Sequence, residues 1–231
     1  MSSLGEAPIV QSVTYRRLVL RKRLILLGLA VLLIFSVLLD LALGPARYSL
    51  SEVLGALFSP ETASAQVRVV MWDIRLPVAL MAVAVGAALS LAGAQMQTIL
   101  NNPLASPFTL GISAAAGFGA ALGLAFGVAL FPLAAQYMVP LNAFVMAMLS
   151  ALLIHFMSMR RGVTAETIVL LGIALVFTFN ALLALVQFFA TEQAVAAVVF
   201  WTMGSLTKAT WPKLGVICLV ILITLPIFAK R

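Results

Sequence analysis

The sequence predicts an all-α protein that crosses a membrane several times. Of its 231 residues, 64% are hydrophobic and only 9% are charged, and the mean hydropathy is +1.17. A soluble domain carries about 25% charged residues, far more than this chain. The apolar residues form continuous runs of about 20 residues, the length at which a helix spans a bilayer core. These runs do not alternate with polar residues, which excludes a β-barrel.

The first apolar run follows five basic residues, between Arg16 and Arg23. Its length of about 20 residues exceeds the ~7–15 of a signal peptide core and favours an uncleaved anchor helix. We therefore expect a cytoplasmic basic N-terminus, residues 1–23, and a transmembrane domain, residues 24–231. The six expected spans are Leu24–Leu43, Pro77–Leu100, Thr109–Phe131, Met138–Met157, Thr167–Ala190 and Leu214–Ala229.

The basic residues orient these spans. With the N-terminus in the cytoplasm, nine Lys and Arg residues lie in inner segments and five in outer ones, which together make the 14 in the chain. This excess on the inside predicts that both termini are cytoplasmic. The same clustering beside apolar runs argues against a nucleic-acid partner, despite the net charge of +7.

The long outer segment 44–76 has predicted structure of its own. Ser49 and Glu52 have the spacing of a capping box, so a short helix is expected to follow Ser49. At the end of this segment, Pro77 can occupy the first turn of the second span because that position needs no backbone N–H.

The turn after the second span, residues 101–107, is uncharged and contains two prolines. Pro103 and Pro107 cannot continue a helix, and the side chains of Asn101 and Asn102 can cap or turn the backbone. An uncharged turn on the cytoplasmic side suits a surface that meets another protein or closes a pore. It also suits a merely short loop, and the residues leave both interpretations open.

Signals of an enzyme are nearly absent from the sequence. The chain has one His and one Cys, and no HExxH or GxxxxGK[ST] motif, so it does not bind ATP through a phosphate loop. Asp40 and Glu166 lie at the ends of spans, whereas ion-coupled transporters place ionisable groups deep in the membrane. If the protein transports a solute, we expect its energy to come from another chain.

Small residues recur at helical spacing in the second and third spans. Gly119, Gly123 and Gly127 form a predicted GxxxGxxxG ridge, and Gly86 and Gly93 mark the second span. Such residues let helices approach closely. Packing within one subunit is the favoured interpretation, and packing between subunits is the alternative.

Two amide side chains stand out in the fifth span. Asn180 and Gln187 are seven residues apart and therefore share one helix face. Hydrogen bonds between helices would explain them. The wall of a wide, wetted substrate pathway would explain them too.

Several segments resemble the FecCD permease family, the membrane subunits of type II ABC importers for iron–siderophores, haem and vitamin B12. They read RLP at residues 75–77, GAALSLAGAQMQ at 86–97 and NPLASPFTLG at 102–111, and Trp201-Thr-Met-Gly-Ser-Leu is followed by Trp211. The resemblance covers the whole chain. It implies a ten-helix subunit that pairs, as a homo- or heterodimer, around a central pathway in the bacterial inner membrane.

The resemblance also implies partners and a cargo. Two cytoplasmic ATPases bind and hydrolyse ATP, so no cofactor is expected in this chain and the chain itself is not an enzyme. A periplasmic binding protein would deliver a metal chelate, with a ferric siderophore as the leading interpretation and haem or vitamin B12 as the alternatives. The siderophore coordinates the iron, so the permease needs no metal ligands.

The resemblance also implies roles for individual residues. Arg75 would dock the binding protein, but Val78 replaces the second arginine that usually follows, and Arg68, Lys208 or Lys213 would then compensate. Asn180 and Gln187 would line the pathway. The cytoplasmic gate would include Asn102, Pro103, Leu104 and, in a second element, Thr164.

The length of the chain departs from the family pattern. Members have about ten spans, and the coupling loop that grips the ATPase and the last four spans are missing after residue 231. A fragment, a truncated gene product and one part of a split subunit are the explanations we consider. A non-transporting remnant or scaffold is the alternative function, and a six-span chain is not expected to transport alone.

Overall fold

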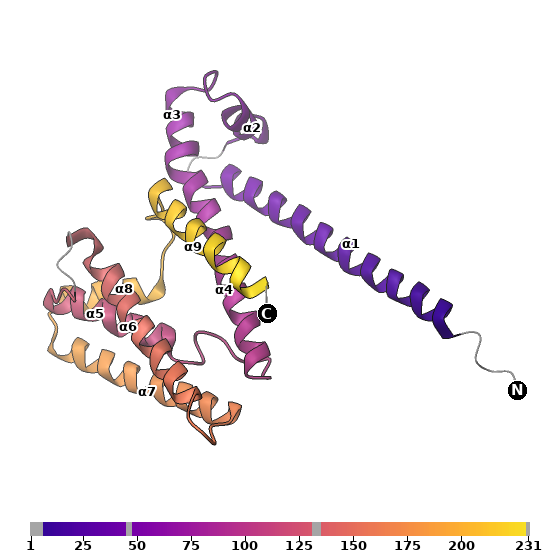
Figure 1. Ribbon diagram of the computed structural model, residues 1–231. Helices are drawn as coiled ribbons and strands as arrows, with labels where there is room; N and C mark the ends of the chain where they lie inside the picture. Colours follow the sequence, from indigo (N-terminus) through magenta and orange to yellow (C-terminus); the bar gives the residue numbers. More distant parts are fainter. Residues whose placement is uncertain (1–6, 45–47, 131–134, 230–231) are drawn as a thin grey trace, which may run out of the picture. The chain divides into compact units, whose positions relative to one another are not determined.

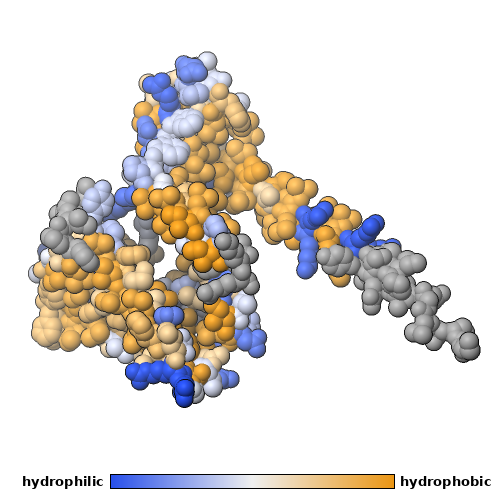
Figure 2. Space-filling model, viewed as in Figure 1, coloured by the Kyte–Doolittle hydropathy of each residue, from blue (hydrophilic) through white to orange (hydrophobic). Residues whose placement is uncertain are grey.

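The computed structural model describes residues 7–44, 48–130 and 135–229, and these residues form helices joined by turns, with no strand among them (Figure 1). Apolar side chains cover most of the surface seen in Figure 2. Within the described residues, four helices are long and apolar enough to cross a membrane. They are Arg16–Ala42, Ala65–Ile99, Tyr137–Ser158 and Ala165–Phe189, and two shorter apolar helices are Ile112–Phe126 and Trp211–Ile227. The predicted all-α, multi-span architecture is confirmed.

The chain folds into two compact units. The first comprises Met1–Ala82 and Ala209–Leu214, and the second comprises Val83–Lys208 and Gly215–Arg231. In chain order the elements are α1 (Ala7–Ala42), α2 (Leu50–Phe58), α3 (Ala65–Val69), the π-helix η1 (Val70–Arg75), α4 (Leu76–Ile99), α5 (Ile112–Phe126), α6 (Ala135–Ser158), α7 (Ala165–Phe189), α8 (Glu192–Met203) and α9 (Trp211–Ala229).

Helix α1 begins earlier than the predicted span. It runs unbroken from Ala7 through the basic residues to Ala42, so the basic segment and the apolar run are one helix. Among its side chains from Arg16 to Ala42, the large apolar ones are mostly exposed, and only Leu41, near the end, is fully buried. Leu41 packs in the core of the first unit with Val53 and Met71.

Helix α2 has the N-terminus that the sequence predicts. The Ser49 hydroxyl oxygen accepts the N–H of Glu52, and the Glu52 carboxylate accepts the backbone N–H of Ser49 at 2.8 Å. This capping box satisfies two N–H groups that would otherwise lack partners. The bonds from the Ser49 backbone and hydroxyl lower the pKa of Glu52. Val53 and Ala56 on α2 are buried in the first unit.

A π-turn interrupts the helix that leads into α4, and together with Pro77 it leaves one backbone carbonyl without a partner in the helix. Pro77 lies in the first turn of α4, as predicted, but the helix already begins at Ala65. In η1 the N–H of Leu76 bonds to the oxygen of Met71, five residues back. The next residue, Pro77, has no N–H to give to the carbonyl of Trp72. That carbonyl instead accepts the indole N–H of Trp211 at 2.9 Å.

Helix α5 occupies the middle of the second unit, where α6, α7 and α8 pack against it (Figure 1). A Cβ atom added at Gly119 would lie 2.4 Å from the backbone oxygen of Asn142 on α6. The missing side chain therefore lets α6 approach closely. Asn142 is fully buried, and its amide accepts the N–H of Leu130 and donates to the oxygen of Val128. The close approach thus places an amide that ties down the segment after α5.

The predicted glycine ridge has two members rather than three. Helix α5 ends at Phe126 instead of Phe131, and Gly127 is its C-cap in the left-handed conformation, with φ of 66°. Residues 131–134 lie outside the described residues. Gly123 faces Asn142 as Gly119 does, whereas Cβ atoms at Gly86 and Gly93 would meet nothing within 4 Å. A packing role for Gly86 and Gly93 stays a prediction.

The contrast between Gly119 and Gly86 can be measured. We expect Gly119→Ala to destabilise the protein by about 1–3 kcal/mol because the new methyl group meets the backbone of Asn142, which cannot move aside as a side chain can. Gly86→Ala is the matched control, and the higher helix propensity of alanine should leave it neutral or more stable. Thermal unfolding in detergent measures both. Equal shifts in the two variants would contradict this packing.

The bond between Trp211 and the carbonyl of Trp72 can be tested through Pro77. Trp211→Phe keeps an aromatic ring beside Trp72 but loses the N–H, and should cost about 1 kcal/mol. Pro77→Ala restores a backbone N–H that can satisfy the same carbonyl within the helix. We therefore expect Trp211→Phe to cost less in the Pro77→Ala background, which a double-mutant cycle of thermal unfolding measures. Additive effects would show that Pro77 is not the reason for the bond.

Candidate functional site

The turn between α4 and α5 is held by its own asparagines. Asn101 has φ of 46°, a left-handed conformation that asparagine tolerates better than most residues. The side-chain oxygen of Asn102 accepts the N–H of Leu104 at 2.9 Å, and the N–H of Asn102 bonds to the oxygen of Gln97. These bonds replace the helical ones that end at Ile99. The sequence-based prediction of a turn shaped by asparagine side chains is confirmed.

The second half of the turn is held by two hydroxyl groups. The N–H of Ser106 donates to the Thr109 hydroxyl oxygen at 2.9 Å, and the N–H of Thr109 donates to the Ser106 hydroxyl oxygen at 3.3 Å. This reciprocal pair supplies polar partners without any charged residue. The turn can therefore be both uncharged and well defined in shape.

A contact between two glycines fixes the end of the turn against α7. A Cβ atom at Gly111, whose φ is +75°, would lie 2.8 Å from the Cβ atom of Leu175 and 3.2 Å from the oxygen of Gly172. A Cβ atom at Gly172 would lie 2.8 Å from the Cα atom of Leu110. The two segments thus meet backbone to backbone. The sequence contained both glycines, but nothing in a single sequence indicated that they pair.

The start of the turn lies beside the start of α7. The hydroxyl oxygen of Thr164 accepts the N–H of Thr167 and caps α7. Residues from both segments line one shallow pocket, which comprises Leu100, Asn101, Asn102, Ala165, Glu166, Val169 and Leu170. The structure therefore brings Asn102 next to the helix that Thr164 begins, which are the two elements expected to form a gate. Their role as a gate stays a prediction.

The other residues predicted for the gate and the pathway have more open positions. Pro103 is exposed, and Leu104 has 78% of its surface exposed. On α7, Asn180 is exposed and Gln187 is half-buried, and neither belongs to the fully buried set of that helix, which includes Gly172 and Leu175. An exposed amide on an apolar helix is compatible with a pathway wall. That role also stays a prediction.

Arg75 occupies a cradle in the first unit that the sequence did not reveal. Its guanidinium donates from Nη1 to the oxygen of Leu41, at the end of α1. The guanidinium carbon lies 5.0 Å from the centre of the Tyr48 ring, a cation–π distance. A Cβ atom at Gly44 would lie 2.5 Å from Nη2, so a side chain at this position would force the guanidinium to shift. Arg75 therefore fastens the end of α1 to η1.

The FecCD transport family matches residues 32–230. An ABC transporter permease protein of Methanocaldococcus jannaschii is 36% identical over 220 residues, 91% of this chain and 62% of that relative. The molybdate import permease MolB of Haemophilus influenzae is 32% identical and covers 82% of this chain and 56% of its own length. The chain thus spans less than two thirds of the length of these relatives.

A solved structure supports the same relation. It is described as an inward-facing conformation of a metal-chelate type ABC transporter and superposes with a TM-score of 0.70. The sequences are 28% identical, and the match covers 87% of this chain and 61% of that one. Further relatives are named as importers of vitamin B12 and of iron(3+)-hydroxamate, so the named cargoes differ among similar proteins.

The cradle around Arg75 predicts a structural cost for its removal. Arg75→Met loses a charged hydrogen bond to Leu41 and should destabilise the protein by about 1.5–3 kcal/mol. Tyr48→Leu removes the aromatic face and should cost about 0.5–1 kcal/mol. Arg68→Met, an exposed position on α3, removes the same charge and serves as the control. A melting temperature for Arg75→Met equal to that of the control would contradict the cradle.

Proposed function

Because the chain belongs to the FecCD transport family, we propose that it acts as the membrane subunit of an ATP-driven importer and forms its translocation pathway as a dimer. The observation that carries this proposal is the uncharged turn held against the start of α7, in a chain with this family relationship. Relatives along most of the chain are named as permease proteins. The hydrolysis of ATP then belongs to a separate cytoplasmic chain.

The proposed gate consists of the turn that contains Asn102 and the capped start of α7. A closed gate needs a surface without charges that attract water, and the turn satisfies its polar groups internally. The close backbone approach at Gly111 and Gly172, which leaves no room for a side chain at either position, supports the idea that the turn and α7 move together. Asn180 and Gln187, further along α7, would then face the solute.

The proposed cargo is an iron(III)–siderophore complex. A large chelate already satisfies its metal ion, so a pathway of apolar and neutral polar groups is sufficient for it. The relatives named for iron(3+)-hydroxamate support this choice, and those named for vitamin B12 and molybdate keep other cargoes in the test. Haem remains a further alternative of similar size.

The proposed partners follow from the same relationship. They are a cytoplasmic ABC ATPase, a periplasmic substrate-binding protein and a second permease subunit in the inner membrane of a bacterium. The basic N-terminal part of α1 supports a cytoplasmic N-terminus. Arg75, in the segment that precedes α4, would then lie on the periplasmic side and present its charge to the binding protein.

The function can be tested by uptake in cells that carry the complete locus. Deletion of the gene for this chain, in a strain without a redundant importer, should abolish uptake of labelled ferric siderophore. Labelled vitamin B12, haem and molybdate, given in parallel, show whether the loss is specific to the chelate. Normal uptake of all four solutes after deletion would contradict the importer proposal, and loss of a different solute would correct only the cargo.

Docking through Arg75 can be separated from the structural role of Arg75. Both Arg75→Met and Arg75→Glu lose the bond to Leu41, but only Arg75→Glu also presents a negative charge to a carboxylate partner. We expect Arg75→Glu to slow uptake more than Arg75→Met, with a larger difference at low ionic strength. Equal uptake in the two variants at all salt concentrations would argue that Arg75 does not dock the binding protein.

A further inference from the structure

The basic part of α1 is a charged surface that the proposed function does not use. Arg16, Arg17, Arg21, Lys22 and Arg23 all lie on this helix and are exposed. Between Ala7 and Leu39 the helix contains no acidic residue. Figure 2 shows the resulting hydrophilic patch next to the apolar part of α1. This surface therefore has the charge to attract an anion, and no carboxylate on the same helix neutralises it.

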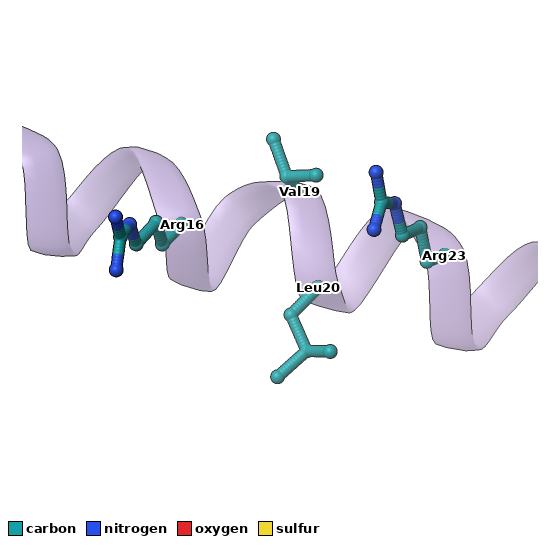
Figure 3. Close-up of a pocket in the computed structure, with 4 residues that line it drawn as sticks. All are labelled: Arg16, Val19, Leu20 and Arg23. Carbon is teal, nitrogen blue, oxygen red and sulfur yellow. The ribbon is translucent and has the colours of Figure 1, made fainter.

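One face of this region combines charge with apolar surface. Arg16, Val19, Leu20 and Arg23 are spaced as i, i+3, i+4 and i+7, which places them in one stripe along the helix. Figure 3 shows both arginines on this stripe with Val19 and Leu20 between them. The four residues line a shallow surface hollow. The two arginines are about 10 Å apart along the axis, at 1.5 Å per residue.

The position of the stripe favours a lipid. The apolar run begins at Leu24, directly after Arg23, so the stripe lies where a bilayer changes from hydrocarbon to headgroups. Leu20 has 58% of its surface exposed, and acyl chains and glycerol would cover that surface better than water does. Arginine side chains at such a boundary reach headgroup phosphates.

We propose that the stripe of Arg16, Val19, Leu20 and Arg23 binds an anionic phospholipid, with its phosphate between the two arginines and its apolar part against Val19 and Leu20. The proposal concerns the helix alone and holds whether or not the protein is an importer. An acidic protein segment is less suitable as a partner. The other basic residues point to other sides of the helix, so they do not combine with this stripe into one basic surface that a protein could cover. Free phosphate does not explain the apolar residues.

The test uses the full chain in nanodiscs made of equal parts of phosphatidylglycerol and phosphatidylcholine. After extraction into detergent, mass spectrometry measures the ratio of the two lipids that remain bound. We expect phosphatidylglycerol to be enriched in the wild type, and the enrichment to fall at least about fivefold in Arg16→Gln/Arg23→Gln. Arg17→Gln/Lys22→Gln loses the same charge from other faces of the helix and is the matched control, with an expected change below about twofold.

Each outcome decides the proposal. Equal losses of phosphatidylglycerol enrichment in the two double variants would overturn it, in favour of non-specific attraction of anionic lipids to all the basic residues of α1. No enrichment in the wild type would overturn it too, and would leave an acidic protein segment as the partner to consider. Excess inorganic phosphate during extraction should not displace the lipid, and displacement would show a simple phosphate site. Uptake assays are not involved, so failure here is distinct from failure of the importer proposal.

Discussion

The missing N–H of Pro77 leaves the carbonyl of Trp72 open to a hydrogen bond from a distant part of the first unit. The π-turn in η1 shifts the hydrogen-bond pattern by one residue, and the proline then leaves the carbonyl of Trp72 without a helical partner. Trp211, more than a hundred residues later in the chain, supplies the missing N–H. The Trp72 indole in turn bonds to the oxygen of Ala56 on α2. The two hydrogen bonds of Trp72 therefore link the segment before α4 to the start of α9 and to the short helix α2.

Close backbone contacts do the corresponding work in the second unit. Gly119 lets α6 reach α5, and Gly111 and Gly172 let the turn reach α7. In lipid, helices gain little from the hydrophobic effect when they associate, so close packing and buried polar bonds must supply the stability. The buried amide of Asn142 is an example, since it satisfies two backbone groups beyond the end of α5. The turn after α4 is thus held without any charged residue of its own, and the charged residue that lines the pocket beside it is Glu166, at the start of α7.

Local signals made much of this fold predictable from the sequence. The six apolar runs coincide with four helices long enough to cross a membrane and two shorter apolar helices. The Ser49–Glu52 spacing predicted the start of α2, and the asparagines predicted the turn after α4. Contacts between residues far apart in the chain were not predictable. Neither the Trp211–Trp72 bond nor the Gly111–Gly172 contact produces a local sequence pattern that would indicate the partner. Helix ends were also misjudged. Gly127 continues the four-residue spacing of Gly119 and Gly123, but it is the C-cap at which α5 ends. Of the predicted gate residues, Asn102 lies beside the start of α7, which Thr164 caps, whereas Pro103 and Leu104 are exposed.

Arg75 makes structural contacts with the same side chain that the proposed docking would use. Its guanidinium group donates from Nη1 to the oxygen of Leu41. The ring of Tyr48 covers one face and restricts rotation. A long side chain that is already ordered loses less conformational entropy when it binds a carboxylate. The contacts with Leu41 and Tyr48 would therefore lower the entropic cost of the proposed docking, and a substitution of Tyr48 that frees the guanidinium would weaken both the structural contact and the proposed one.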